Sequence, residues 1–102
     1  MGLFGAKKPM VTVRLKVAGF VGGRMVTADL QLEVPEGATL KETFKRADKS
    51  GKLPRATLKQ ILAMPKPPTV LHNGNSLDVP DELGAVVAAG DEIAVMTPLG
   101  GG

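Results

Sequence analysis

Residues 34–47, VPEGATLKETFKRA, contain the signals for the end of a strand and the start of a helix. Pro35 has no backbone N–H and Gly37 favours a turn, so a preceding strand should end here. Thr39 is a good N-cap, and Glu42 three residues later completes a capping box. The following apolar residues share one helical face: Leu40, Phe44 and Ala47. The stretch therefore predicts an amphipathic helix that needs a partner layer.

A hairpin before this helix supplies that layer. Residues 11–17 and 26–34 both alternate apolar and polar side chains, which is typical of strands with one buried face. Residues 18–25 contain three glycines and predict a turn between the two runs. Because the apolar face of the hairpin needs a cover, we expect the helix to pack Phe44 onto it.

The rest of the chain predicts one more helix and two more strands. A second helix is expected over about 54–64, with Pro54 in its first turn and Leu58, Ile61 and Leu62 facing inward. Residues 65–68, PKPP, form an extended connector. Their spacing also fits the PxxP ligands of SH3 domains, but we favour the connector, because the need to link a helix to a strand is enough to explain them.

Residues 69–72 predict a short strand that ends at the Asn73-Gly74 turn, and residues 92–97 predict the last strand. Between them we expect an irregular segment with three core contacts: Leu77, Val79 and Leu83. The order of elements indicates an α+β domain, with a mixed sheet of four to five strands covered by one main helix. A length of 102 residues fits a single domain.

Composition disfavours an enzyme. The chain has no Cys, one His (His72) and two Ser, neither in the context of a nucleophile elbow, so we predict no catalytic residues. One His with carboxylates is an unlikely zinc set, and the acidic residues at 78, 81 and 82 lack the spacing of a calcium loop, so no metal site is predicted. Without a long apolar run or a signal peptide, we expect a cytoplasmic protein with no membrane contact.

Charge is unevenly distributed along the chain. Residues 41–66 carry eight basic and two acidic side chains, whereas residues 67–102 carry five acids and no Lys or Arg. Basic helices can bind nucleic acid through phosphates. The absence of Trp and Tyr leaves little for base stacking, so we favour a solvated helix face and expect no nucleic-acid partner.

Four motifs resemble the ubiquitin-like β-grasp sulfur carriers, namely the small subunit of molybdopterin synthase and the carrier of thiamine biosynthesis. They are VPEGATLKE (34–42), VLHNGNSLD (70–78), AAGDEIAVM (88–96) and TPLGGG (97–102). The resemblance implies a β-grasp fold in which the segment 48–68, longer than compact carriers need, holds an inserted helix. Gly100 stands where ubiquitin has Arg and carriers often have a small residue, which favours the carriers.

The resemblance also implies the chemistry of the chain end. The carboxylate of Gly102 would be adenylated by a ubiquitin-activating-enzyme-like adenylyltransferase, which uses the ATP, and then converted to a thiocarboxylate. Gly101 and Gly102 have no Cβ and can thread a narrow tunnel. Gly100, Leu99 and Pro98 would position the end, Pro98 by leaving the sheet because it cannot donate to the ladder.

The resemblance further implies other partners. A molybdopterin-synthase-type large subunit or a thiazole synthase could receive the sulfur. Acidic Asp91 and Glu92 are expected to help dock a basic surface of the activating enzyme. We expect residues 1–9 to form a flexible arm, 10–97 the domain and 98–102 a flexible tail.

Two other functions stay open. The chain could be a protein modifier joined through Gly102 to lysines of target proteins. It could also be a β-grasp interaction module whose terminal glycines have no chemistry.

Overall fold

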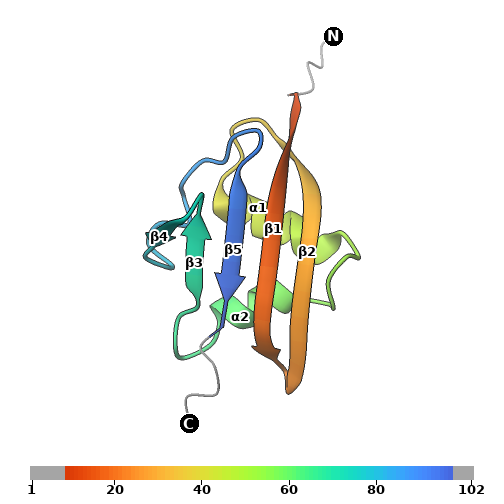
Figure 1. Cartoon of the computed structure of the whole chain (residues 1–102), viewed down its shortest axis with the longest axis vertical. Helices are drawn as coiled ribbons and strands as arrows, with labels where there is room; N and C mark the ends of the chain where they lie inside the picture. Colours follow the sequence, from red (N-terminus) through yellow and green to blue (C-terminus); the bar gives the residue numbers. More distant parts are fainter. Residues whose placement is uncertain (1–8, 98–102) are drawn as a thin grey trace.

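One mixed sheet with two helices against one face makes up the fold (Figure 1). The computed structural model describes residues 9–97, so the predicted arm, except for its last residue, and the tail at 98–102 lie outside the described residues. The elements are β1 (Met10–Val21), β2 (Arg24–Pro35), α1 (Leu40–Lys49), α2 (Thr57–Leu62), β3 (Thr69–His72), β4 (Asn75–Leu77) and β5 (Glu92–Met96).

The sheet has the strand order β2-β1-β5-β3-β4. β1 pairs with β2 in antiparallel and with β5 in parallel orientation, and the β3–β5 and β3–β4 pairs are antiparallel. The last strand of the chain therefore lies in the middle of the sheet, beside the first. The prediction of one mixed sheet is confirmed.

The strand-to-helix signal forms as expected. The backbone N–H of Glu42 donates to Thr39 Oγ1 (3.2 Å), and the backbone N–H of Thr39 donates to Glu42 Oε1 (3.0 Å). This capping box satisfies two N–H groups at the start of α1. α1 then packs Phe44 into the core, so the predicted cover of the hairpin is confirmed.

The core lies between the sheet and the helices. Alternate residues of the strands point into it, and their neighbours point to the opposite, open face of the sheet. The largest fully buried hydrophobic side chains come from both layers: Leu15, Leu40, Leu58, Ile61, Ile93, Val13, Val17, Val34, Val70, Val87 and Val95.

The hairpin turn is much shorter than expected. The prediction of a turn across 18–25 was wrong, because β1 continues to Val21 and β2 begins at Arg24. Only Gly22 (φ 59°) and Gly23 (φ 80°) form the connection. Two consecutive positive φ angles are the requirement of a type I′ hairpin, which matches the twist of the flanking strands.

The second helix exists but is shorter than predicted, Thr57–Leu62 instead of about 54–64. Ala56 adopts a left-handed conformation (φ 55°), which an α-helix cannot continue through, so Pro54 lies before the helix and not in its first turn. Asp48 of α1 replaces the missing cap. Its two carboxylate oxygens accept the backbone N–H groups of Leu58 (2.8 Å) and Lys59 (2.9 Å).

The segment after β3 is more regular than expected. Asn73 (φ 52°) and Gly74 (φ 83°) form the predicted tight turn. It leads into β4, which pairs with β3, where we expected irregular chain. Leu83 is buried, and Leu77 and Val79 pack partly against the core. Over residues 9–97 neither helix has the length and apolar character needed to cross a bilayer.

Candidate functional site

The residues that the sequence singles out at the chain end, from Pro98 to Gly102, lie outside the described residues. Their point of departure is described, because the chain reaches them through Thr97, directly after β5. What holds Thr97 therefore decides where residues 98–102 begin relative to the domain.

Thr97 is held by two hydrogen bonds to β1. Its backbone N–H donates to the carbonyl of Ala18 (3.0 Å), and its Oγ1 accepts the backbone N–H of Phe20 (3.1 Å). The residue is only 7% exposed. The end of β5 is thus fixed to the far half of β1 by backbone and side chain.

Gly19 makes this anchor possible. A Cβ at Gly19 would lie 1.8 Å from Oγ1 of Thr97, and the φ of 151° is one that L residues rarely adopt. Only glycine therefore lets Thr97 settle against β1 at this position. Sequence reasoning read Gly19 as part of a turn and missed this role.

Three exposed apolar side chains surround the anchor on the open face of the sheet. Phe20 is 53% exposed, Met25 is 54% exposed and Met96 is 39% exposed. Phe20 lies opposite Met25 in the β1–β2 pair, and Met96 lies opposite Ala18 in the β1–β5 pair. We call these three residues the exit patch. A hollow of about 630 Å³, lined partly by Ala18, Ala94 and Met96, extends from the patch along the open face.

The sequence held a signal for the exit patch. On β1, Thr12, Arg14 and Lys16 occupy the open face, and Phe20 stands in the same alternation where another polar residue would be expected. One exposed apolar residue needs no explanation, but a group such as Phe20, Met25 and Met96 on one face is typical of a surface that another molecule covers. The glycine-rich context obscured this signal.

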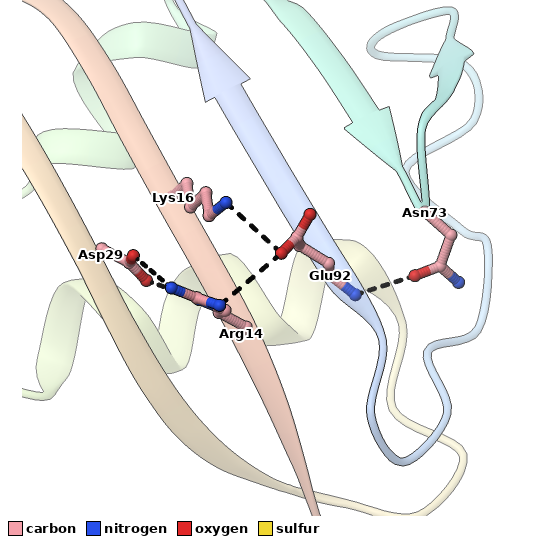
Figure 2. A network of polar contacts seen from close by, with 5 residues as sticks. All are labelled: Arg14, Lys16, Asp29, Asn73 and Glu92. Carbon is pink, nitrogen blue, oxygen red and sulfur yellow. Dashed lines mark hydrogen bonds and ion pairs between the residues drawn. The ribbon is translucent and has the colours of Figure 1, made fainter.

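The other half of the open face is polar (Figure 2). Arg14 of β1 makes a bidentate contact with Asp29 of β2 (2.8 and 2.6 Å), and Lys16 lies 3.4 Å from Glu92 of β5. The hydrogen bond with Arg14 lowers the pKa of Asp29. The backbone N–H of Glu92 also donates to Asn73 Oδ1 (2.8 Å). These contacts join three neighbouring strands and the β3–β4 turn.

Asp91 is engaged inside the fold just before β5. Its carboxylate accepts Nδ2 of Asn73 (3.0 Å) and the backbone N–H of Ala88 (2.7 Å), and lies 2.7 Å from Nε2 of His72. Burial alone would raise the pKa of Asp91. The hydrogen bonds from Asn73, His72 and Ala88 outweigh it and hold that pKa below its ordinary value. His72 thus has a structural partner.

Asp91 and Glu92 do not lie at the point where the chain leaves the sheet. Glu92 begins β5 and Met96 ends it, so about 13 Å separates the two ends at roughly 3.3 Å per residue. The side chain of Asp91 is also largely buried, and the carboxylate of Glu92 lies within ion-pair distance of Arg14 and Lys16. A role of these two residues in binding the activating enzyme stays a prediction, but such binding would not lie beside the chain end.

The remaining acidic residues form no site of their own. The carboxylate of Glu82 accepts the backbone N–H of Asp78, which closes the loop between β4 and β5. Within residues 9–97 no group of three or more His, Asp or Glu side chains is arranged to hold a metal ion.

Fold and site together define the class. A mixed sheet in which the last strand lies parallel to the first, with α1 across one face, is the ubiquitin-like β-grasp fold. The candidate site that the sequence predicts is the end of the last strand and the chain beyond it. The sequence matches the ThiS family over residues 22–102, and the chain belongs to that family.

Two solved structures from Haloferax volcanii share the fold, and a third structure is reported as similar. The Haloferax volcanii HVO 2177 protein is 23% identical, with 89% of this chain and 88% of that chain covered and a TM-score of 0.56. SAMP1 from Haloferax volcanii is 22% identical, with 87% and 99% covered and a TM-score of 0.57. Urm1 from Trypanosoma brucei is 18% identical, with 91% and 97% covered and a TM-score of 0.48. Comparison with curated proteins gives no match.

Proposed function

We propose that this protein is a sulfur carrier whose Gly102 carboxylate is activated and converted to a thiocarboxylate. The observation that carries the proposal is the ThiS family match, which extends through the two final glycines. The anchored Thr97 supports it, because a fixed departure point lets a partner find the chain end in a reproducible place. The protein is then a substrate of other enzymes and has no catalytic residues of its own.

The chemistry needs only the terminal carboxylate from this chain. Ionised at neutral pH, the carboxylate oxygen attacks the α-phosphorus of ATP in the active site of an activating enzyme, and pyrophosphate leaves. Hydrosulfide, supplied by a sulfide donor, then attacks the acyl carbon. The C–S bond forms as the bond to AMP breaks, and loss of the hydrosulfide proton leaves the thiocarboxylate. ATP is held by the partner and no cofactor by the carrier.

The exit patch gives the activating enzyme a surface to bind. Phe20, Met25 and Met96 lie on the same face and next to the Thr97 anchor. Residues 97–102 span about 20 Å when extended, at roughly 3.3–3.6 Å per residue. An enzyme that covers the patch is therefore within reach of Gly102. Glu92 could add electrostatic attraction from the polar half of the same face.

The thiocarboxylate could pass its sulfur to two kinds of partner enzyme. A synthase large subunit of the molybdopterin type, or a thiazole synthase, would take the thiocarboxylate end in its own tunnel. A protein modifier would use the same adenylate but pass Gly102 to a lysine amine, directly or through a thioester. The two functions differ in the product and not in the fold.

The test is reconstitution with a ubiquitin-activating-enzyme-like adenylyltransferase from the source organism, ATP and a sulfide donor. We expect an intact mass increased by the exchange of one oxygen for sulfur at Gly102. The matched control is the chain without Gly102, which should give no exchange. Isopeptide bonds between Gly102 and lysines of other proteins, without thiocarboxylate, would show that the protein is a modifier and not a carrier.

A further inference from the structure

A second surface lies on the helix side of the domain, away from the exit patch. It is a groove of about 570 Å³ between α1 and α2. Its apolar wall combines residues of both helices and of the loop before β5: Phe44, Ala56, Leu58, Leu62 and Leu83. Phe44, Leu58 and Leu83 are buried, whereas Leu62 is only partly covered by the fold.

The rim of this groove is positively charged. Four lysines line it: Lys41, Lys45, Lys49 and Lys59. All four are exposed, and none forms an ion pair with another residue in the described range 9–97. Elsewhere the basic residues of the open face do have acidic partners, as Arg14 and Lys16 show. The groove lining therefore carries four positive charges against the single carboxylate of Asp48, around an apolar wall.

The one carboxylate that lines the groove, Asp48, forms no ion pair with a lysine among the described residues. Both oxygens of Asp48 are directed at backbone N–H groups of α2. Asp48 thereby fixes α2 against α1 and holds the two walls of the groove together. The groove is thus built by a specific contact and is not an accidental gap between loosely packed helices.

The chemistry of the groove selects its occupant. The partly exposed side chains of Leu62 and Ala56 need an apolar partner, and four ammonium groups that form no ion pair within residues 9–97 need carboxylates. Nucleic acid would satisfy the charges but not the wall, because Phe44, the aromatic residue there, is buried and cannot stack on a base. The segment at residues 1–8 carries Lys7 and Lys8 and no acid, so charge disfavours it as the occupant.

We propose that the α1–α2 groove docks an acidic amphipathic segment of a partner protein, with apolar side chains on the wall and carboxylates over the lysines. This is the helix-in-groove mode of peptide recognition. The groove lies on the face opposite the exit patch, so the partner can bind while the chain end is engaged elsewhere. The inference rests on the groove alone and does not depend on the chemistry of Gly102.

The probe is a synthetic fluorescein-labelled peptide with Leu at positions i, i+3, i+4 and i+7 and Glu at most others. Its anisotropy is titrated with the full chain. We expect a Kd on the order of micromolar that weakens with salt, as screened charge contacts do. Amide chemical shifts should change along α1 and α2 and not on the open face. A peptide with the leucines replaced by serine should bind at least about tenfold more weakly.

Two matched variants locate the site. Lys45→Glu/Lys49→Glu reverses two rim charges and should weaken binding by about tenfold or more, a loss of about 1.4 kcal/mol. Arg24→Glu/Lys66→Glu changes the net charge equally at exposed positions outside the groove and should weaken it far less. Phe20→Ser, on the opposite face, should bind as the wild type does.

Several results would overturn the proposal. They are equal losses in the two charge-reversal variants, equal binding of the serine peptide, or no binding of any acidic peptide at millimolar concentration. Sedimentation should show a monomer at these concentrations. A dimer that Lys45→Glu/Lys49→Glu dissociates would show that a second copy, and not a partner's acidic segment, covers the groove.

Discussion

The two ends of β5 differ sharply in how their side chains are used. At its start, Asp91 and Glu92 direct their polar groups to His72, Asn73, Arg14 and Lys16, so the contacts stay within the domain. At its end, Thr97 is fixed to β1, and the apolar side chains around it face solvent.

We infer that the start of β5 serves the stability of the domain and that its end serves the proposed function. The first end closes the sheet against the β3–β4 turn, and the second provides a fixed departure point with an uncovered apolar surface beside it. Substitutions at the first end should therefore change the free energy of unfolding, and substitutions at the second end should change activation. A substitution at Gly19 should change both the free energy of unfolding and activation, because Gly19 packs against Thr97, where the chain leaves the sheet.

The largest effect is expected at the chain end. Deletion of Gly102, or Gly101→Trp, should abolish adenylation, because a bulky side chain cannot follow the path that two glycines allow. The measurement is ATP–pyrophosphate exchange with the activating enzyme. The unfolding midpoint in urea should equal that of the wild type. Exchange at the wild-type rate in either variant would contradict the assignment of function to this end.

Gly19→Ala should be the most destabilising single substitution among these predictions, by about 3 kcal/mol. The new Cβ would lie 1.8 Å from Oγ1 of Thr97, so the anchor must move. Urea unfolding gives the free energy, and the rate of activation should fall as well.

The matched control for this substitution is Gly23→Ala. Gly23 also has a positive φ (80°), but nothing lies within 4 Å of its added Cβ. It should cost only the conformational strain, about 1–2 kcal/mol. Equal losses at the two glycines would show that contact with Thr97 does not matter.

Asp91→Ala should destabilise the domain by about 2 kcal/mol at neutral pH, because hydrogen bonds from Asn73, His72 and Ala88 to a charged group are lost. The folded pKa of Asp91 lies below its ordinary value. Its contribution is therefore complete above the unfolded pKa of about 3.9 and is lost as pH falls through the folded pKa.

The pH dependence gives the measurement for this prediction. The difference in unfolding free energy between wild type and Asp91→Ala should shrink as the pH falls below about 4. A difference that grows below pH 4 would contradict the ionised role. The activation rate at neutral pH should change little, since Asp91 lies at the far end of β5.

The smallest effect is expected at the exit patch. Phe20→Ser should leave stability nearly unchanged, because the side chain is 53% exposed, and should raise the KM for the activating enzyme about tenfold, or about 1.4 kcal/mol. Met10→Ser is the control, an exposed apolar residue near the other end of β1. Equal kinetics for the two variants would remove the exit patch from the docking surface.

Local signals in the sequence predicted most of the fold. The capping box at Thr39, the alternation of the hairpin and the Asn73-Gly74 turn act through neighbouring residues, so they can be read without tertiary structure. Gly19 could not be read in this way, because its role depends on Thr97, which follows 78 positions later. The left-handed Ala56 also shortened the second helix without any sequence signal for it.

In the candidate site, too, some features follow from local sequence and others depend on tertiary contacts. The glycines at 101 and 102 and the family resemblance follow from local sequence, and the family is confirmed. The anchor and the exit patch depend on which strands become neighbours. The expectation that Asp91 and Glu92 lie near the chain end came from closeness in sequence, but a strand of five residues places them at the other edge of the open face.

The most direct test of the central claim is the intact mass of the protein purified from its source organism under conditions that preserve thiocarboxylates. We predict a fraction in which one oxygen of the Gly102 carboxylate is replaced by sulfur, located by fragmentation to the last residue and lost after alkaline hydrolysis. A protein found only with an unmodified carboxylate, in cells that synthesise sulfur-containing cofactors, would contradict the account.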